Sequence, residues 1–215
     1  MKKTLSYIFP LFLLCSASLA RHEIQLINLS DAKKAVYDYH VSGNYERDVN
    51  KAVDEALLIL SFLSIPAHSA FVFDIDETAL SSWSYQVNYN FSYAEALWDN
   101  WIDSANAKAI PGVKRLYDSL NNKNIHIIFL TGRKQSQYQK TLENLRKEAY
   151  TNFDTLICRP PEFESKTALA YKSHIRKQLS KKYHIIGSVG DQWSDLDGGW
   201  TILKVKIPNY LYTIE

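Results

Sequence analysis

Short apolar runs and amphipathic stretches alternate along most of the chain. Apolar residues at helical spacing predict helices over 35–41, 47–63, 112–120, 136–149 and 167–182. Five runs are too short for typical helices and rich in β-branched or aromatic residues, which predicts strands at Ala70–Ile75, Ile125–Leu130, Thr155–Cys158, His184–Val189 and Ile202–Ile207. Strands alternating with helices imply right-handed crossovers. The pattern therefore predicts an α/β fold with a doubly wound, Rossmann-type parallel sheet.

The segment from about residue 80 to residue 124 breaks this alternation. It is too long for a simple crossover, and seven aromatic residues gather in its first part: Trp83, Tyr85, Tyr89, Phe91, Tyr93, Trp98 and Trp101. We expect a small helical cap inserted over the carboxyl ends of the strands. Aromatic faces suit stacking on a nucleobase or an aryl group. For each single ring, a place in the core or in a dimer contact is the alternative.

The first twenty residues have the features of an export signal. Lys2 and Lys3 precede an apolar run from Leu5 to Leu14, and small residues follow up to Ala20. This pattern predicts a signal peptide over residues 1–20 and a periplasmic or secreted protein. The apolar run is shorter than the roughly 20 residues that a membrane-spanning helix needs, and Pro10 interrupts it. We therefore expect no membrane attachment after cleavage.

Composition narrows the possible partners. The chain has 215 residues, of which 46% are hydrophobic, enough to bury an ordinary globular core. Its net charge of +2 comes from the two lysines of the expected signal, since 23 basic and 23 acidic residues remain without them. This balance argues against nucleic acid as a partner. Cys158 would be the only cysteine after cleavage, so no internal disulfide is expected.

Polar residues follow three of the predicted strands. The first strand leads into Asp74 and Asp76, the second into Thr131-Gly132-Arg133, and a third into Gly190-Asp191 with Asp195 four residues on. Ligands of open parallel sheets bind beyond the carboxyl ends of the strands. One carboxylate of the first pair could attack phosphorus while the other handles the proton of the leaving group. Taken alone, each cluster is also compatible with ordinary loop or turn residues.

The remaining candidates would bind phosphate and metal. The Thr131 hydroxyl and nearby backbone N–H groups could hold phosphate oxygens. Lys166 and Lys172 are the two lysines that could offset the charge of a phosphate lying against carboxylates. The carboxylates form an oxygen-rich ligand set without histidine, which suits a hard cation such as Mg²⁺: Asp74, Asp76, Asp191 and Asp195.

Together, these motifs resemble those of the haloacid dehalogenase superfamily. Within it, the chain is similar to the class B acid phosphatase family, which also includes plant vegetative storage proteins. The resemblance covers most of the chain that would remain after signal cleavage. It is closest at Phe73–Thr78, Tyr171–Ser173 and Gly190–Leu196.

The resemblance implies a role for each site residue. Asp74 would be the nucleophile that forms an aspartyl-phosphate, and Asp76 would protonate the leaving group and then activate water. Thr131 would orient the phosphoryl group, and Lys172, which fits the family motif better than Lys166, would neutralise it. Mg²⁺ would be held by the Asp74 carboxylate, the Asp76 backbone carbonyl and Asp191, with Asp195 as a ligand or a supporting group.

The function expected from this resemblance is that of an exported, Mg²⁺-dependent acid phosphatase acting on small phosphomonoesters, with nucleoside monophosphates among the candidates. A phosphotransferase would use the same aspartyl-phosphate with an alcohol as acceptor. A non-catalytic binding or storage protein on the same fold is the alternative from a different class. The sequence leaves the physiological substrate, the pH optimum and the oligomeric state open, and a homo-oligomer is compatible with it.

Overall fold

The structure is a computed structural model that describes residues 27–214. The expected signal peptide, residues 1–20, lies outside the described residues. Among the residues described, no helix is both long enough and apolar enough to cross a membrane.

Five parallel strands form the central sheet, in the order β5-β4-β1-β6-β7. The five predicted strands are all present, with bounds shifted by a few residues: β1 (Ser69–Phe73), β4 (His126–Lys134), β5 (Thr155–Arg159), β6 (His184–Gly190) and β7 (Leu203–Lys206). The predicted doubly wound α/β fold is confirmed. The largest shift is in β4, which extends through the Thr131-Gly132-Arg133 motif instead of ending before it.

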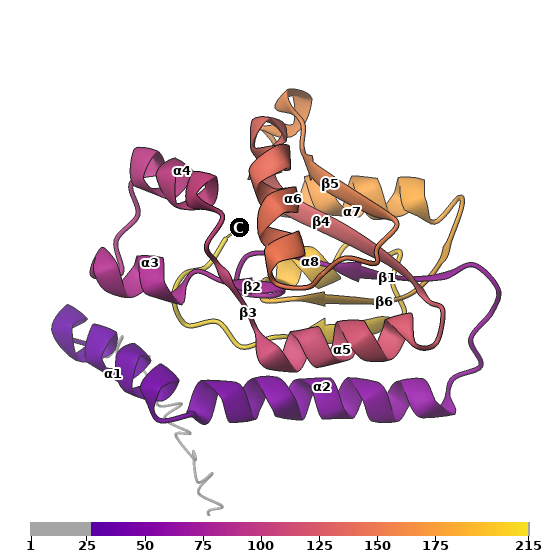
Figure 1. The fold of residues 1–215 in the computed structure, drawn as a ribbon, viewed down its shortest axis with the longest axis horizontal. Helices are drawn as coiled ribbons and strands as arrows, with labels where there is room; N and C mark the ends of the chain where they lie inside the picture. The colour runs from indigo at the N-terminus through magenta and orange to yellow at the C-terminus, as the bar shows by residue number, and fades with distance from the viewer. Residues whose placement is uncertain (1–26, 215) are drawn as a thin grey trace, which may run out of the picture.

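Helices cover both faces of the sheet because successive side chains of a strand point to opposite faces. Phe71 and Phe73 of β1 belong to the larger core, with α2 (Asn44–Phe62), α5 (Pro111–Asn121) and α6 (Tyr138–Lys147). Ala70 and Val72 face the other way, into a smaller core with α7 (Ala168–Leu179). Figure 1 shows α2 and α5 lying side by side along one face. Outside the segment between β1 and α5, the other helical elements described are α1 (Leu29–Val41), α8 (Trp193–Leu196) and the short 3-10 turns η1 (Gln135–Gln137) and η2 (Pro161–Phe163).

A small helical lobe projects beyond the sheet between β1 and α5 (Figure 1). Its base is an antiparallel pair of short strands, β2 (Leu80–Ser81) and β3 (Lys108–Ala109). Between them lie α3 (Trp83–Asn88) and α4 (Glu95–Ser104). The lobe is shorter than the insertion expected at about 80–124, because α5 leaves it and packs against α2 in the helical layer on the sheet.

Strand register brings the motifs to one edge of the sheet. Phe73, the last residue of β1, is level with Phe129 on β4 and with Val189 on β6. The Asp74 N–H continues this pairing by donating to the Val189 carbonyl at 3.0 Å. The residues that follow these positions on the three strands therefore emerge close together.

Candidate active site

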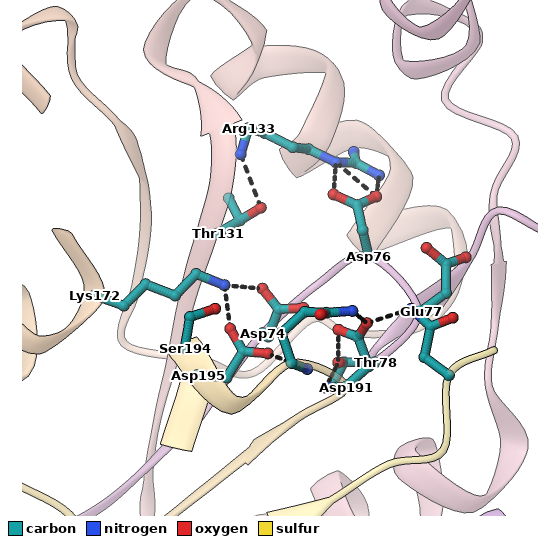
Figure 2. A network of polar contacts seen from close by, with 12 residues as sticks. Asp74, Asp76, Glu77, Thr78, Thr131, Arg133, Lys172, Asp191, Ser194 and Asp195 are labelled. Carbon is teal, nitrogen blue, oxygen red and sulfur yellow. Dashed lines mark hydrogen bonds and ion pairs between the residues drawn. The ribbon is translucent and has the colours of Figure 1, made fainter. Parts of the chain in front are cut away.

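Asp74 and Lys172 form a buried ion pair at this edge of the sheet. Asp74 follows β1 and Lys172 projects from α7, and each residue is 6% exposed. The Lys172 Nζ donates to Asp74 Oδ1 at 2.5 Å and also to Oδ1 of Asp195. Figure 2 shows Lys172 reaching between these two carboxylates. The single ammonium group thus holds both acidic side chains in place.

The pKa values of Asp74 and Lys172 both differ strongly from their usual values. Burial, with the Asp195 carboxylate adding to it, raises the pKa of Asp74 well above its usual value, although Lys172 opposes the change. Burial also works against the charge of Lys172, but the two carboxylates outweigh it and raise the pKa of Lys172. Lys172 is therefore a permanent cation beside Asp74 at physiological pH.

Asp191 joins Asp74 and Asp195 in a compact carboxylate cluster. Each of the three side chains offers an oxygen, and these oxygens lie within 4.8 Å of one another. Burial, followed by the nearby Asp195 and Glu77 carboxylates, raises the pKa of Asp191 to about 7. One lysine faces three acidic groups, and the raised pKa values of Asp74 and Asp191 show that three negative charges are unfavourable here without a further cation. Buried oxygen ligands that need additional positive charge fit a hard divalent cation such as Mg²⁺.

Asp76 lies apart from this cluster and pairs with Arg133. The Arg133 Nη2 donates to Asp76 Oδ1 at 2.7 Å, and its Nε donates to Oδ2 at 3.0 Å. Arg133 also donates from Nη1 to the Thr141 hydroxyl at 3.3 Å. The Asp76 carboxylate therefore faces arginine rather than the other acids (Figure 2). That the Asp76 backbone carbonyl binds the metal stays a prediction.

Thr131 is completely buried at the base of the same arrangement. Its hydroxyl accepts a hydrogen bond from the Arg133 N–H at 3.1 Å. Lys166, the alternative to Lys172, is an exposed residue in the loop before α7. The structure therefore brings Asp74, Lys172, Asp191 and Asp195 together, places Asp76 and Thr131 beside Arg133, and leaves Lys166 outside the cluster.

Glu77 is a buried acid that the sequence analysis did not single out. It has a positive φ of 55°. Its Oε1 accepts from the Ser82 N–H at 2.6 Å, and its Oε2 accepts from the Tyr212 hydroxyl. Burial, with Asp76 adding to it, raises the pKa of Glu77 to about 7. Glu77 thus links the loop after β1 to the start of α3 and to the end of the chain.

Thr78 ties the loop after β1 to Asp191. The Asp191 N–H donates to the Thr78 hydroxyl at 3.0 Å, and this hydroxyl contacts Asp191 Oδ1 at 3.3 Å. Two side-chain amides also hold this carboxylate, since Gln192 and Asn209 each donate to Asp191 Oδ2 at 2.6 Å. The sequence analysis identified neither amide as part of the site.

A cavity of about 450 Å³ opens onto these groups. Asp74, Asp76, Arg133, Lys172 and Asp191 line it on the sheet side. Three cap aromatics contribute to its wall, as do four residues near the end of the chain: Phe91, Tyr93 and Trp98, and Leu211, Tyr212, Thr213 and Ile214.

Two further cap rings, Tyr85 and Trp83, make structural contacts. Tyr85 is buried and contacts Trp98 edge-to-face at a centroid distance of 5.1 Å. Trp83 stacks on His40 of α1, with ring centroids 4.0 Å apart and planes 7° from parallel. The aromatic segment therefore divides between the core of the cap, a contact with α1 and the wall of the cavity.

Comparisons with known proteins agree with this geometry. A profile of the family described as "HAD superfamily, subfamily IIIB (Acid phosphatase)" matches residues 13–215. Vegetative storage protein 1 of Arabidopsis thaliana is 31% identical over 193 residues, covering 86% of this chain and 71% of the relative. Acid phosphatase 1 of Solanum lycopersicum is 29% identical over 186 residues, covering 83% of this chain and 73% of the relative.

A solved structure shares the fold. The class C acid phosphatase from Bacillus anthracis superposes with a TM-score of 0.72 at 21% identity, covering 85% of each chain. The matched profile spans nearly the whole sequence and includes every residue of the cluster around Asp74. The chain therefore belongs to the acid phosphatases of HAD superfamily subfamily IIIB and is a phosphomonoesterase of that family.

Proposed function

We propose that this protein is an exported, Mg²⁺-dependent phosphatase that hydrolyses small phosphomonoesters through a phosphorylated Asp74. The observation that carries the proposal is the buried Lys172–Asp74 ion pair beside the Asp191 and Asp195 carboxylates. The nucleophile, the fixed cation and Asp191 line the cavity, and Asp195 completes the oxygen-rich ligand set.

In the first step, a carboxylate oxygen of Asp74 attacks phosphorus. The bond between phosphorus and the leaving-group oxygen breaks, and Asp76 gives that oxygen a proton. Lys172 stabilises the negative charge that the phosphoryl oxygens carry in the transition state. Thr131, buried beside the Arg133 backbone, helps to orient these oxygens.

In the second step, water attacks the phosphorus of the aspartyl-phosphate. Asp76, now deprotonated, takes a proton from this water, and the bond to Asp74 breaks to release inorganic phosphate. Asp74 returns as a carboxylate and Asp76 as an acid, so every proton is accounted for. Arg133 keeps the Asp76 carboxylate oriented for its two roles.

Mg²⁺, when bound, would neutralise charge on the phosphate so that it can approach the acids. The residues that would hold it are Asp74, Asp191 and Asp195, together with the Asp76 backbone carbonyl. This assignment rests on the chemistry of the donors, because buried carboxylates without histidine or cysteine in the cluster suit Mg²⁺ better than softer metals.

The cavity supports small substrates that have a planar leaving group. Its volume of about 450 Å³ falls within the range for small-molecule sites. Phe91, Tyr93 and Trp98 offer aromatic surfaces on which an aryl group or a nucleobase could stack. Nucleoside monophosphates and aryl phosphates are therefore the substrates to test first.

Hydrolysis of p-nitrophenyl phosphate by the exported protein tests the proposal. We expect phosphate release with Mg²⁺, loss of activity with EDTA, and no activity for Asp74→Asn. Asp31→Asn, which alters an exposed acid on α1, serves as the control and should retain activity. Intact-mass measurement after acid quenching should show a phosphoryl adduct on the native protein and none on Asp74→Asn.

The alternatives predict different outcomes of the same assay. A storage or binding protein would release no phosphate with any divalent metal at any pH. A phosphotransferase would convert an added nucleoside into a nucleotide at the expense of free phosphate. Export is tested separately by determining the N-terminus of the protein recovered from the culture medium or periplasm. We expect that N-terminus to follow Ala20.

A further inference from the structure

The chain leaves the sheet beside the carboxylate cluster. The last strand pair of β6 and β7 joins Gly190 and Lys206, and the Ile207 N–H extends this pairing by donating to the Gly190 carbonyl at 2.9 Å. Residues 207–214, here called the C-terminal segment, therefore begin next to Asp191. Figure 1 shows the segment continuing toward the cap.

Asn209 in this segment has a fixed side-chain orientation. Its Oδ1 accepts a hydrogen bond from the Leu211 N–H at 2.7 Å, which is the two-residue spacing of an Asx turn. With the oxygen occupied in this way, the amide nitrogen faces Asp191 and donates to its Oδ2 at 2.6 Å. The turn thus presents a donor to an acceptor-only carboxylate.

The contacts of the two Asp191 oxygens are unequal. Oδ2 accepts from Asn209 and from Gln192, both at 2.6 Å, whereas Oδ1 has a contact of 3.3 Å with the Thr78 hydroxyl. Both amides hold the carboxylate through Oδ2. They fix its orientation relative to Asp74 and Asp195 and leave Oδ1 the less engaged oxygen.

Further hydrogen bonds connect the same segment to the rest of the site. The Tyr212 hydroxyl donates to Glu77, and the Ile214 N–H donates to Gln192 Oε1 at 3.0 Å. Leu211 and Tyr212 also line the cavity that contains Asp74 and Lys172. The segment therefore contacts both the carboxylate cluster and the space in which the leaving group would lie.

We propose that the C-terminal segment is part of the active site and that Asn209 is a positioning residue that orients the Asp191 carboxylate for Mg²⁺. The inference rests on the proposed function. Residues that hydrogen-bond to a metal ligand typically change metal affinity by about 10- to 100-fold when they are replaced. A loss of this size is expected when the Asn209 amide is removed.

Calorimetric titration of the metal-free protein with Mg²⁺ tests this role directly. Asn209→Ala removes both the turn and the donor. Asn209→Ser keeps a side-chain oxygen for the Leu211 N–H but is too short to reach Asp191. We expect both variants to bind Mg²⁺ about 10- to 100-fold more weakly than the native protein. At saturating Mg²⁺, their kcat should return toward the native value, whereas their KM for the phosphate ester should change little.

Asn152→Ala is the matched control, since the Asn152 side chain is exposed and donates to Asn121. It should bind Mg²⁺ like the native protein. If Asn209→Ser bound Mg²⁺ with native affinity while the native protein bound the ion and hydrolysed ester, the positioning role would be wrong and the proposed function would stand. A native protein that neither bound Mg²⁺ nor released phosphate would overturn both.

Discussion

Arg133 donates hydrogen bonds to both carboxylate oxygens of Asp76, and the Arg133 side chain is almost completely buried. Its side chain is 1% exposed, against 19% for that of Asp76. The planar guanidinium matches a carboxylate with two parallel hydrogen bonds, which a lysine cannot reproduce. The orientation of the proposed general acid is therefore set by a residue at the end of a neighbouring strand.

Arg133→Lys should impair proton donation more than it impairs binding. Lysine keeps the charge but loses the two-point contact with Asp76, so the carboxyl group would lose its fixed orientation. p-Nitrophenolate leaves without needing a proton, whereas an alkoxide needs one. We expect kcat/KM to fall by about 100-fold for an alkyl phosphate, at the lower end of the range attributed to general acids, and by only a few-fold for p-nitrophenyl phosphate.

Arg115→Lys is the control for this experiment, because Arg115 forms a solvent-exposed ion pair with Asp54 at 2.7 Å. It should leave both rate constants unchanged. Equal losses of kcat/KM on the two esters in Arg133→Lys would show that Arg133 does not act through proton transfer.

Lys172→Met should destabilise the protein as well as inactivate it. The substitution leaves Asp74 and Asp195 as neighbouring buried acids without their cation. Breaking a buried ion pair by removing one partner costs about 3–5 kcal/mol. Urea unfolding at pH 7.5 should show a loss of this order, and a smaller loss when Lys172→Met is made in an Asp74→Asn background.

Lys166→Met provides the comparison that the sequence left open. Lys166 is exposed, so its replacement should change neither the free energy of unfolding nor kcat/KM. If Lys166→Met abolished activity and Lys172→Met did not, the assignment of the phosphate-binding lysine would be reversed.

The parallel sheet was predictable because its signals are local. Short apolar runs ended in chemically distinctive residues, such as Asp74 after β1 and Asp191 after β6. In a parallel sheet, strand ends meet at one edge, so their proximity followed from the fold class alone. The limits of the cap were less well predicted, although Pro111 at the start of α5 is a helix-start signal that could have divided the segment.

The supporting contacts were beyond the reach of sequence reasoning. Arg133 lies 57 positions from Asp76, and Tyr212 lies 135 positions from Glu77. No periodicity links such residues, because their pairing depends on where the chain returns after leaving the sheet. The family motif favoured Lys172 over Lys166, but the contacts of Lys172 with Asp74 and Asp195 are likewise visible only in the fold.

Stability of the metal-free protein should fall as the pH rises from about 5 to about 7.5. Burial raises the pKa of Glu77 from its usual 4.5 to about 7, and it also raises that of Asp191 to about 7. Between the unfolded and folded pKa values, the folded protein binds protons that the unfolded chain has released, so increasing pH favours unfolding. Melting temperatures measured in EDTA across this range should show the decline.

Glu77→Gln should make this decline shallower, because glutamine keeps an oxygen for the Ser82 N–H but does not titrate. Glu46→Gln, an exposed acid in the first turn of α2, should leave the slope unchanged. A slope equal to that of the native protein in Glu77→Gln would exclude Glu77 as one of the groups responsible.

Tyr93→Ala should weaken binding of aromatic substrates without destabilising the fold. Tyr93 lines the cavity and yet is 71% exposed, so its ring contributes little to the core of the cap. Stacking of an aromatic ring on a base contributes about 1–3 kcal/mol, which corresponds to a rise in KM of about 5-fold or more. The rise should occur for a nucleoside monophosphate or an aryl phosphate and be absent for a small alkyl phosphate.

Tyr37→Ala, on α1 and not among the residues lining the cavity, should leave both KM values unchanged. Equal KM increases for aromatic and alkyl esters in Tyr93→Ala would mean that the ring shapes the cavity without stacking on the leaving group.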